Sequence, residues 1–136
     1  MPSKPFKHPS SDLTESMPLV YTAVSKHLFY YRMFISKFVI EAGAVPLNPF
    51  MIFDYFLLDS VDRDKVRRGN NNLVMRTDEL WVFGAVSNGV LAEIQLAKIH
   101  KKPIRYFAIE KPQKIVSISL DEVELELDVA EHRAEL

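Results

Sequence analysis

Residues 77–94 read TDELWVFGAVSNGVLAEI and decide the fold of the chain. The apolar run at 80–83 is typical of a buried strand, the small residues at 84–89 predict a turn, and the apolar spacing that follows predicts a helix. A helix that begins near Ser87 presents unpaired backbone N–H groups and the positive end of its dipole. We therefore expect a strand, a turn that can bind an anion such as phosphate, and a helix.

Strand and helix patterns alternate on both sides of this segment. We expect strands at 19–24, 44–47, 104–109 and 115–120, helices at 26–42, 62–72 and 88–100, and a short helix or capped turn at 51–58. Such alternation implies parallel strands joined by right-handed crossovers. The predicted fold is a single flavodoxin/Rossmann-like α/β domain, with a parallel sheet of about five strands and helices on both faces.

Composition divides the chain into three parts. Residues 1–16 are rich in Ser, Pro and Lys and predict a mobile N-terminal arm, and residues 17–120 form the α/β domain. Within 121–136 apolar residues alternate with acidic ones, which favours a C-terminal edge strand followed by a polar tail.

Charge and cysteine content narrow the class of protein. The 136-residue chain has a formal net charge of −1 and contains no cysteine. We expect no nucleic-acid polymer as partner, because no global positive field is present. No apolar run approaches the length of a membrane span, so we expect no membrane partner and a cytoplasmic location. The histidines lack metal-ligand spacing, so we expect no metal.

The expected strand order brings two distant loops together. In a flavodoxin-like sheet the loop at 25–27 lies beside the turn at 84–89, at the carboxyl ends of the strands where ligands bind. Ser87 and Asn88 are either plain helix caps or phosphate-binding groups. Glu93 borders the apolar face of its helix, so it either complements the helix dipole or faces the cleft as a nucleophile or ligand. The candidate pocket residues are Ser25, His27, Gly84, Ser87, Asn88, Gly89 and Glu93.

Three segments carry a resemblance to a known family. Asp78 to Gly84, Ser87 to Ile94 and Lys102 to Ile104 resemble the nucleoside 2-deoxyribosyltransferase-like superfamily, whose relatives include 2'-deoxynucleoside 5'-monophosphate N-glycosidases. The resemblance implies that Glu93 attacks the anomeric carbon of a nucleoside, without a cofactor. It also implies substrate-binding roles, in which Ser87 and the backbone of Asn88 and Gly89 hold a 5'-phosphate and Tyr21 lines the sugar or base site. Apart from the resemblance, His27 is a weaker candidate for contact with a phosphate.

The leading hypothesis is therefore cleavage or transfer of the N-glycosidic bond of a nucleoside or nucleoside 5'-monophosphate. The alternative is a non-catalytic nucleotide sensor, because the chain has Asn70-Asn71-Asn72 where relatives often have an aspartate ahead of the third strand, and the loop at 24–27 lacks their Gly-Pro turn. A third reading is a structural subunit. Related enzymes build pockets at subunit interfaces, so we expect a homodimer or higher homo-oligomer, formed through the aromatic-rich first helix or the apolar edge at 123–129.

Overall fold

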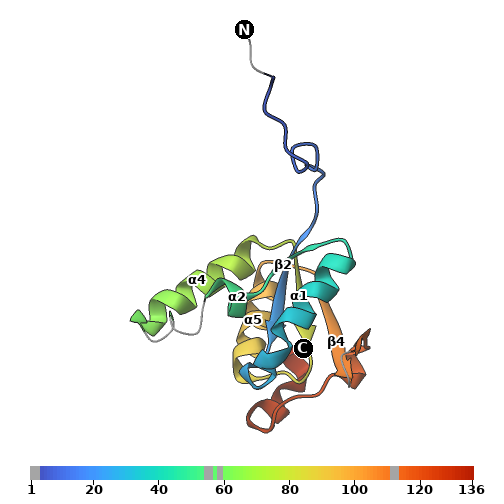
Figure 1. Ribbon diagram of the computed structural model, residues 1–136. Coiled ribbons are helices and arrows are strands. Elements are labelled where there is room, and N and C mark those ends of the chain that lie inside the picture. The colour runs from blue at the N-terminus through green and yellow to red at the C-terminus, as the bar shows by residue number, and fades with distance from the viewer. Residues whose placement is uncertain (1–3, 54–56, 58–59, 111–113) are drawn as a thin grey trace.

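The structure is a computed structural model that describes residues 4–53, 57, 60–110 and 114–136 (Figure 1). Its strands are β1 (Leu19–Val24), β2 (Val45–Leu47), β3 (Glu79–Phe83), β4 (Ile104–Glu110) and β5 (Lys114–Ser117). Its helices are α1 (Arg32–Glu41), α2 (Pro49–Ile52), α4 (Arg63–Arg76) and α5 (Asn88–Ile99), with 3₁₀ helices η1 (Lys26–Tyr31), η2 (Leu120–Glu122) and η3 (Leu127–Glu135).

One five-stranded sheet organises these elements in the order β2-β1-β3-β4-β5. The pairs β2–β1, β1–β3 and β3–β4 are parallel, which confirms the predicted flavodoxin-like α/β fold. The last pair corrects the expectation of a wholly parallel sheet, because β5 runs antiparallel to β4. A short connection permits this hairpin, whereas another parallel strand would need a long crossover.

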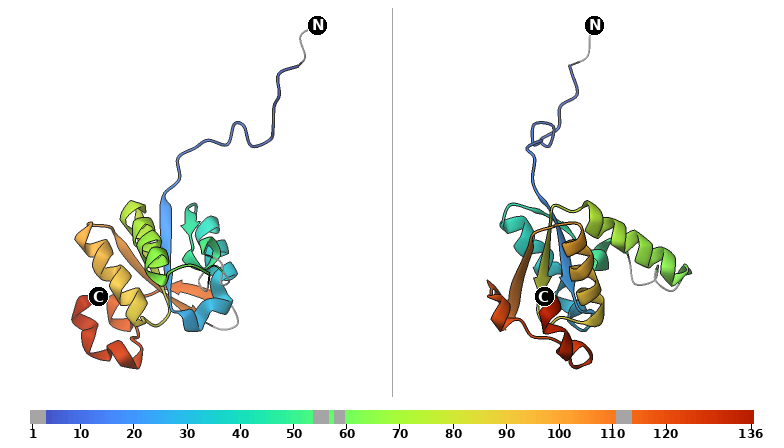
Figure 2. Two further views of the ribbon diagram at one scale, coloured as in Figure 1. Left: turned by 90° about the vertical axis from the view of Figure 1, so that its left-hand side faces the viewer. Right: turned by 180° about the vertical axis from the view of Figure 1, so that it is seen from behind.

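Helices cover both faces of the sheet, as Figure 2 shows in its left view. Alternate strand residues point to opposite faces, so Val20 and Tyr21 belong to different apolar clusters. One cluster lies under α1 and is rich in aromatic rings, including Trp81, Phe83 and Phe107. The other joins the sheet to α4, α5 and the C-terminal segment. The central strands β1 and β3 are thus buried on both faces, as expected for parallel strands.

Two helical predictions need correction. The helix expected at 26–42 is divided into η1 and α1, and the backbone at Leu28 is non-helical with φ −107° and ψ 17°. Leu28 lies within η1, and its side chain packs against the turn at Gly84. Part of the element expected at 51–58 is seen as α2, which begins earlier at Pro49, and residues 54–56 and 58–59 lie outside the described part of the chain.

The C-terminal edge strand is a wrong prediction. Leu125 makes an isolated parallel bridge with Val86, and the chain then forms η3. Val123 and Val129 are buried, whereas Leu127 between them is 96% exposed. Val123 is the C-cap of η2 and Val129 lies in η3, so the alternating residues belong to separate short elements and not to one strand.

The N-terminal arm leaves the domain at β1. Residues 4–16 are exposed along their whole length and extend away from the sheet (Figure 1). Within the described residues, no helix has both the length and the apolar character needed to cross a membrane.

Gly84 is required by the backbone of the turn after β3. Its φ of +77° is unfavourable for residues with a Cβ, and an added Cβ would lie 2.4 Å from Leu28 Cδ1. We expect Gly84→Ala to lower the free energy of unfolding by about 1–3 kcal/mol. Gly89→Ala is the control, because space there is open and the position is helical. Urea denaturation of both variants checks the prediction, which equal stabilities would contradict.

Candidate functional site

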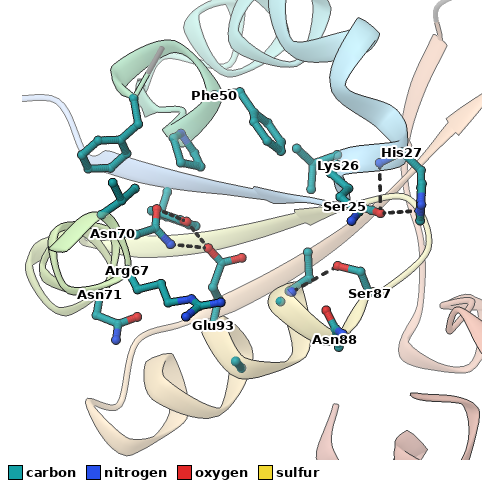
Figure 3. A pocket seen from close by; sticks show the side chains of 18 of the residues that line it. Ser25, Lys26, His27, Phe50, Arg67, Asn70, Asn71, Ser87, Asn88 and Glu93 are labelled. Atoms are coloured by element: carbon teal, nitrogen blue, oxygen red, sulfur yellow. Dashed lines mark hydrogen bonds between the residues drawn. The ribbon is translucent and has the colours of Figure 1, made fainter. Parts of the chain in front are cut away.

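A cavity of about 670 Å³ opens at the carboxyl ends of β1 and β3. This is the place where the strand order reverses, and its volume lies within the roughly 300–1,000 Å³ of small-molecule sites. The loop after β1, the beginning of α5, one face of α4, residues of α2 and part of the C-terminal segment form its walls. Figure 3 shows Asn70 and Glu93 in one part of the cavity and Ser25, His27 and Ser87 in another.

Two side chains from two other elements meet at the carboxylate of Glu93. The Asn70 amide of α4 donates a hydrogen bond to Glu93 Oε2 over 2.9 Å, and the Tyr21 hydroxyl of β1 donates to the same oxygen. The Tyr21 hydroxyl also lies 2.8 Å from Oδ1 of Asn70, which completes a ring of contacts. The described residues donate no hydrogen bond to Oε1 of Glu93.

Local structure explains how Glu93 reaches this position. Ser87 caps α5 by accepting a hydrogen bond from the backbone of Val90, and the helix buries Val90, Leu91, Ile94 and Ala97 against the sheet. Glu93 lies one helical turn beyond the first of these residues, at the margin of the buried face. Its side chain is only partly exposed, and it lines the cavity.

Burial changes the acidity of both groups in this contact. Desolvation raises the pKa of Glu93 from 4.5 to about 7, although hydrogen bonds from Tyr21 and Asn70 act in the opposite direction. The pKa of Tyr21 lies well above its ordinary value, because burial and the neighbouring Glu93 charge disfavour the phenolate. Tyr21 therefore stays protonated as a donor, while Glu93 changes its charge near neutral pH.

The raised pKa of Glu93 predicts a pH-dependent cost to stability. Between about pH 4.5 and pH 7 the folded chain retains a proton that the unfolded chain releases, so the free energy of unfolding falls as pH rises. Glu93→Gln removes this titration. We therefore expect the difference in free energy of unfolding, Glu93→Gln minus wild type, to become more positive by up to about 3 kcal/mol between pH 4 and pH 8. Urea denaturation tests this, and exposed Glu124→Gln should show no such trend.

A second cluster lies where the loop after β1 meets the C-terminal segment. The Ser25 hydroxyl donates to Glu126 Oε2 over 2.6 Å, and His27 Nδ1 lies 3.3 Å from the same oxygen. Leu125, the neighbour of Glu126, is bridged to Val86 immediately before the cap of α5. The cluster therefore adjoins the beginning of α5.

The structure brings eight of the nine candidate residues into one cavity, which is lined by Tyr21, Ser25, His27, Asn70, Ser87, Asn88, Gly89 and Glu93. Gly84 is the exception, because it shapes the preceding turn and packs against Leu28 without lining the cavity. Sequence reasoning missed Phe50, Arg67 and Glu126 as lining residues. The alternating pattern around Glu126 predicted an edge strand, and nothing in the sequence indicated that Glu126 lines the cavity.

Among the described residues, no group of three or more His, Asp or Glu side chains could hold a metal ion.

Comparison with known proteins assigns the chain to a family. Residues 20–107 match a domain of unknown function (DUF7768), and the chain belongs to that family. The structure is similar to a 2-desoxiribosyltransferase from Leishmania mexicana, with a TM-score of 0.54 and 13% sequence identity, covering 87% of this chain and 97% of that chain. At this identity the likeness establishes a shared fold. No curated protein matches the chain.

Proposed function

We propose that the cavity binds a nucleoside or nucleoside 5'-monophosphate and that Glu93 cleaves or transfers its N-glycosidic bond. The observation that carries the proposal is the Glu93 carboxylate, which lines a ligand-sized cavity and is held through Oε2 by Tyr21 and Asn70. A carboxylate that only complemented the helix dipole would need neither the buried Tyr21 nor the partly buried Asn70 as a partner. The fold shared with a 2-desoxiribosyltransferase also supports the proposal.

The chemistry follows from this geometry. Oε1 of ionised Glu93 attacks the anomeric carbon as the bond to the base nitrogen breaks, and the electron pair of that bond leaves with the base. The base takes up a proton, and a glycosyl ester forms on Glu93. Attack by water on the anomeric carbon breaks its bond to Glu93, restores the carboxylate and releases the sugar and one proton, which balances the proton taken up by the base. Attack by a second base breaks the same bond, loses its own N–H proton and completes a transfer. Tyr21 and Asn70 keep Oε2 in place throughout.

The other walls suit the remaining parts of such a substrate. Phe50 and Phe53 line the cavity and supply aromatic surface for a nucleobase. Phe50 is held by an edge-on contact with Phe29, with ring centroids 5.4 Å apart. The cavity also includes Asn71 and Arg67 of α4, whose polar groups can bind base or sugar oxygens.

The direct test is release of free base. The purified chain is incubated with a panel of ribo- and deoxyribonucleosides and their 5'-monophosphates, with and without a second base, and products are separated by chromatography. Release of base with any member supports the proposal, and exchange of bases indicates transfer. Binding by calorimetry without release of base would contradict it and favour the sensor hypothesis.

A further inference from the structure

We propose that Glu126 makes the cavity select a nucleoside with a free 5'-hydroxyl and reject its 5'-monophosphate. The inference rests on the proposed function and narrows its substrate class. It concerns the part of the cavity around the beginning of α5, where backbone N–H groups of Asn88 and Gly89 would otherwise favour a phosphate.

The backbone fixes Glu126 beside that helix terminus. Val86 donates its N–H to the carbonyl of Glu124 over 2.8 Å and accepts from the N–H of Glu126 over 2.8 Å. These two bonds hold the C-terminal segment against the residue that precedes the Ser87 cap. The Glu126 side chain then lines the cavity together with Asp128.

The Glu126 carboxylate is also fixed by its side-chain partners. Ser25, which is 1% exposed, donates to Oε2 over 2.6 Å. The Glu126 side chain is 23% exposed, whereas that of its other neighbour, His27, is 67% exposed. Lys26 also lines the cavity but is exposed, so water screens its charge more than that of Glu126. The least screened charge beside the beginning of α5 is therefore negative.

A hydroxyl matches this arrangement and a phosphate does not. The oxygen of a hydroxyl can accept from an N–H at the beginning of α5 while its proton is donated to Glu126. An ionised phosphate offers acceptor oxygens only, and its charge is repelled by the carboxylate of Glu126. Asp128 adds little to this repulsion because, like Lys26, it is exposed. Repulsion between the like charges of the phosphate and Glu126 would therefore disfavour binding of the 5'-monophosphate.

The test compares each nucleoside with its own 5'-monophosphate in the base-release assay. We expect the wild type to have the higher kcat/KM for the nucleoside. Glu126→Gln keeps the shape and should shift the ratio toward the monophosphate by about tenfold or more. Glu124→Gln is the matched control, because Glu124 is exposed and lies outside the cavity lining, and its ratio should equal that of the wild type. Thermal denaturation checks that all three chains are folded.

Two outcomes overturn the inference, namely a wild type that prefers monophosphates and a Glu126→Gln ratio equal to that of the wild type. Calorimetric affinities for the same ligand pairs separate this result from failure of the proposed function. If no base is released but Glu126→Gln still shifts the affinity ratio toward the monophosphate, Glu126 selects the ligand and the glycosidase proposal falls. If neither ligand binds, both proposals fall.

Discussion

Glu93→Gln should abolish base release, with a loss in kcat of at least about a thousandfold, while the protein remains folded. The amide oxygen of glutamine can still accept hydrogen bonds from Tyr21 and Asn70, so the substitution preserves the local geometry. It removes the negative charge that attacks the anomeric carbon and stabilises the oxocarbenium-like transition state. Progress curves of free base, measured at high enzyme concentration, give the residual rate.

The control for this experiment is Glu124→Gln, an equivalent change of charge on an exposed residue outside the cavity lining. Its rate should match that of the wild type. Calorimetry with a nucleoside substrate should show that Glu93→Gln still binds, because the lost interaction develops mainly during the reaction. A Glu93→Gln chain that releases base at the wild-type rate would remove Glu93 from the mechanism.

Tyr21→Phe should shift the acidic limb of the pH–rate profile to higher pH. The Tyr21 hydroxyl stabilises ionised Glu93, so its removal raises the pKa of Glu93 further above its present value of about 7. A smaller fraction of Glu93 is then ionised at neutral pH, and Oε2 loses one of its two anchors. We expect kcat at pH 7 to fall by about 10- to 100-fold, with partial recovery in more alkaline buffer.

Tyr106→Phe provides the matched control for this prediction. Tyr106 lies on β4, is partly buried and does not line the cavity, so loss of its hydroxyl should leave the pH–rate profile unchanged. A uniform loss of activity in Tyr21→Phe, without displacement of the acidic limb, would show that Tyr21 acts through packing and does not tune Glu93.

Periodicity predicted the parts of the fold that are built from long regular elements. Residues 77–94 predicted β3, its turn and α5 because burial and capping signals agree there. The reversed direction of β5 was missed although the sequence held the signal, because the strands predicted at 104–109 and 115–120 are separated by a connection too short for a parallel crossover. The non-helical backbone at Leu28, whose side chain lies against Gly84, was not predicted either, because a contact between residues distant in the sequence leaves no local pattern.

The candidate site was also predictable only in part. The loops that follow β1 and β3 were expected to lie close together, because the predicted strand order makes these two strands neighbours. The Asn70 contact with Glu93 depends on the register of α4 against α5, which apolar spacing does not determine to one residue. Glu126 reaches the cavity through backbone pairing with Val86, and backbone groups leave no trace in the sequence.

The two edge strands of the sheet, β2 and β5, limit how copies of this chain could assemble. β2 spans Val45–Leu47 and contains Pro46, which lacks an N–H, while β5 spans Lys114–Ser117 and begins with a charged residue. Short edge strands that contain proline or a charged residue are poor templates for strand pairing between molecules. A homodimer would accordingly be joined by apolar side chains such as those of Tyr30 and Met33, which are 85% and 65% exposed, and not by a continuous sheet across two copies.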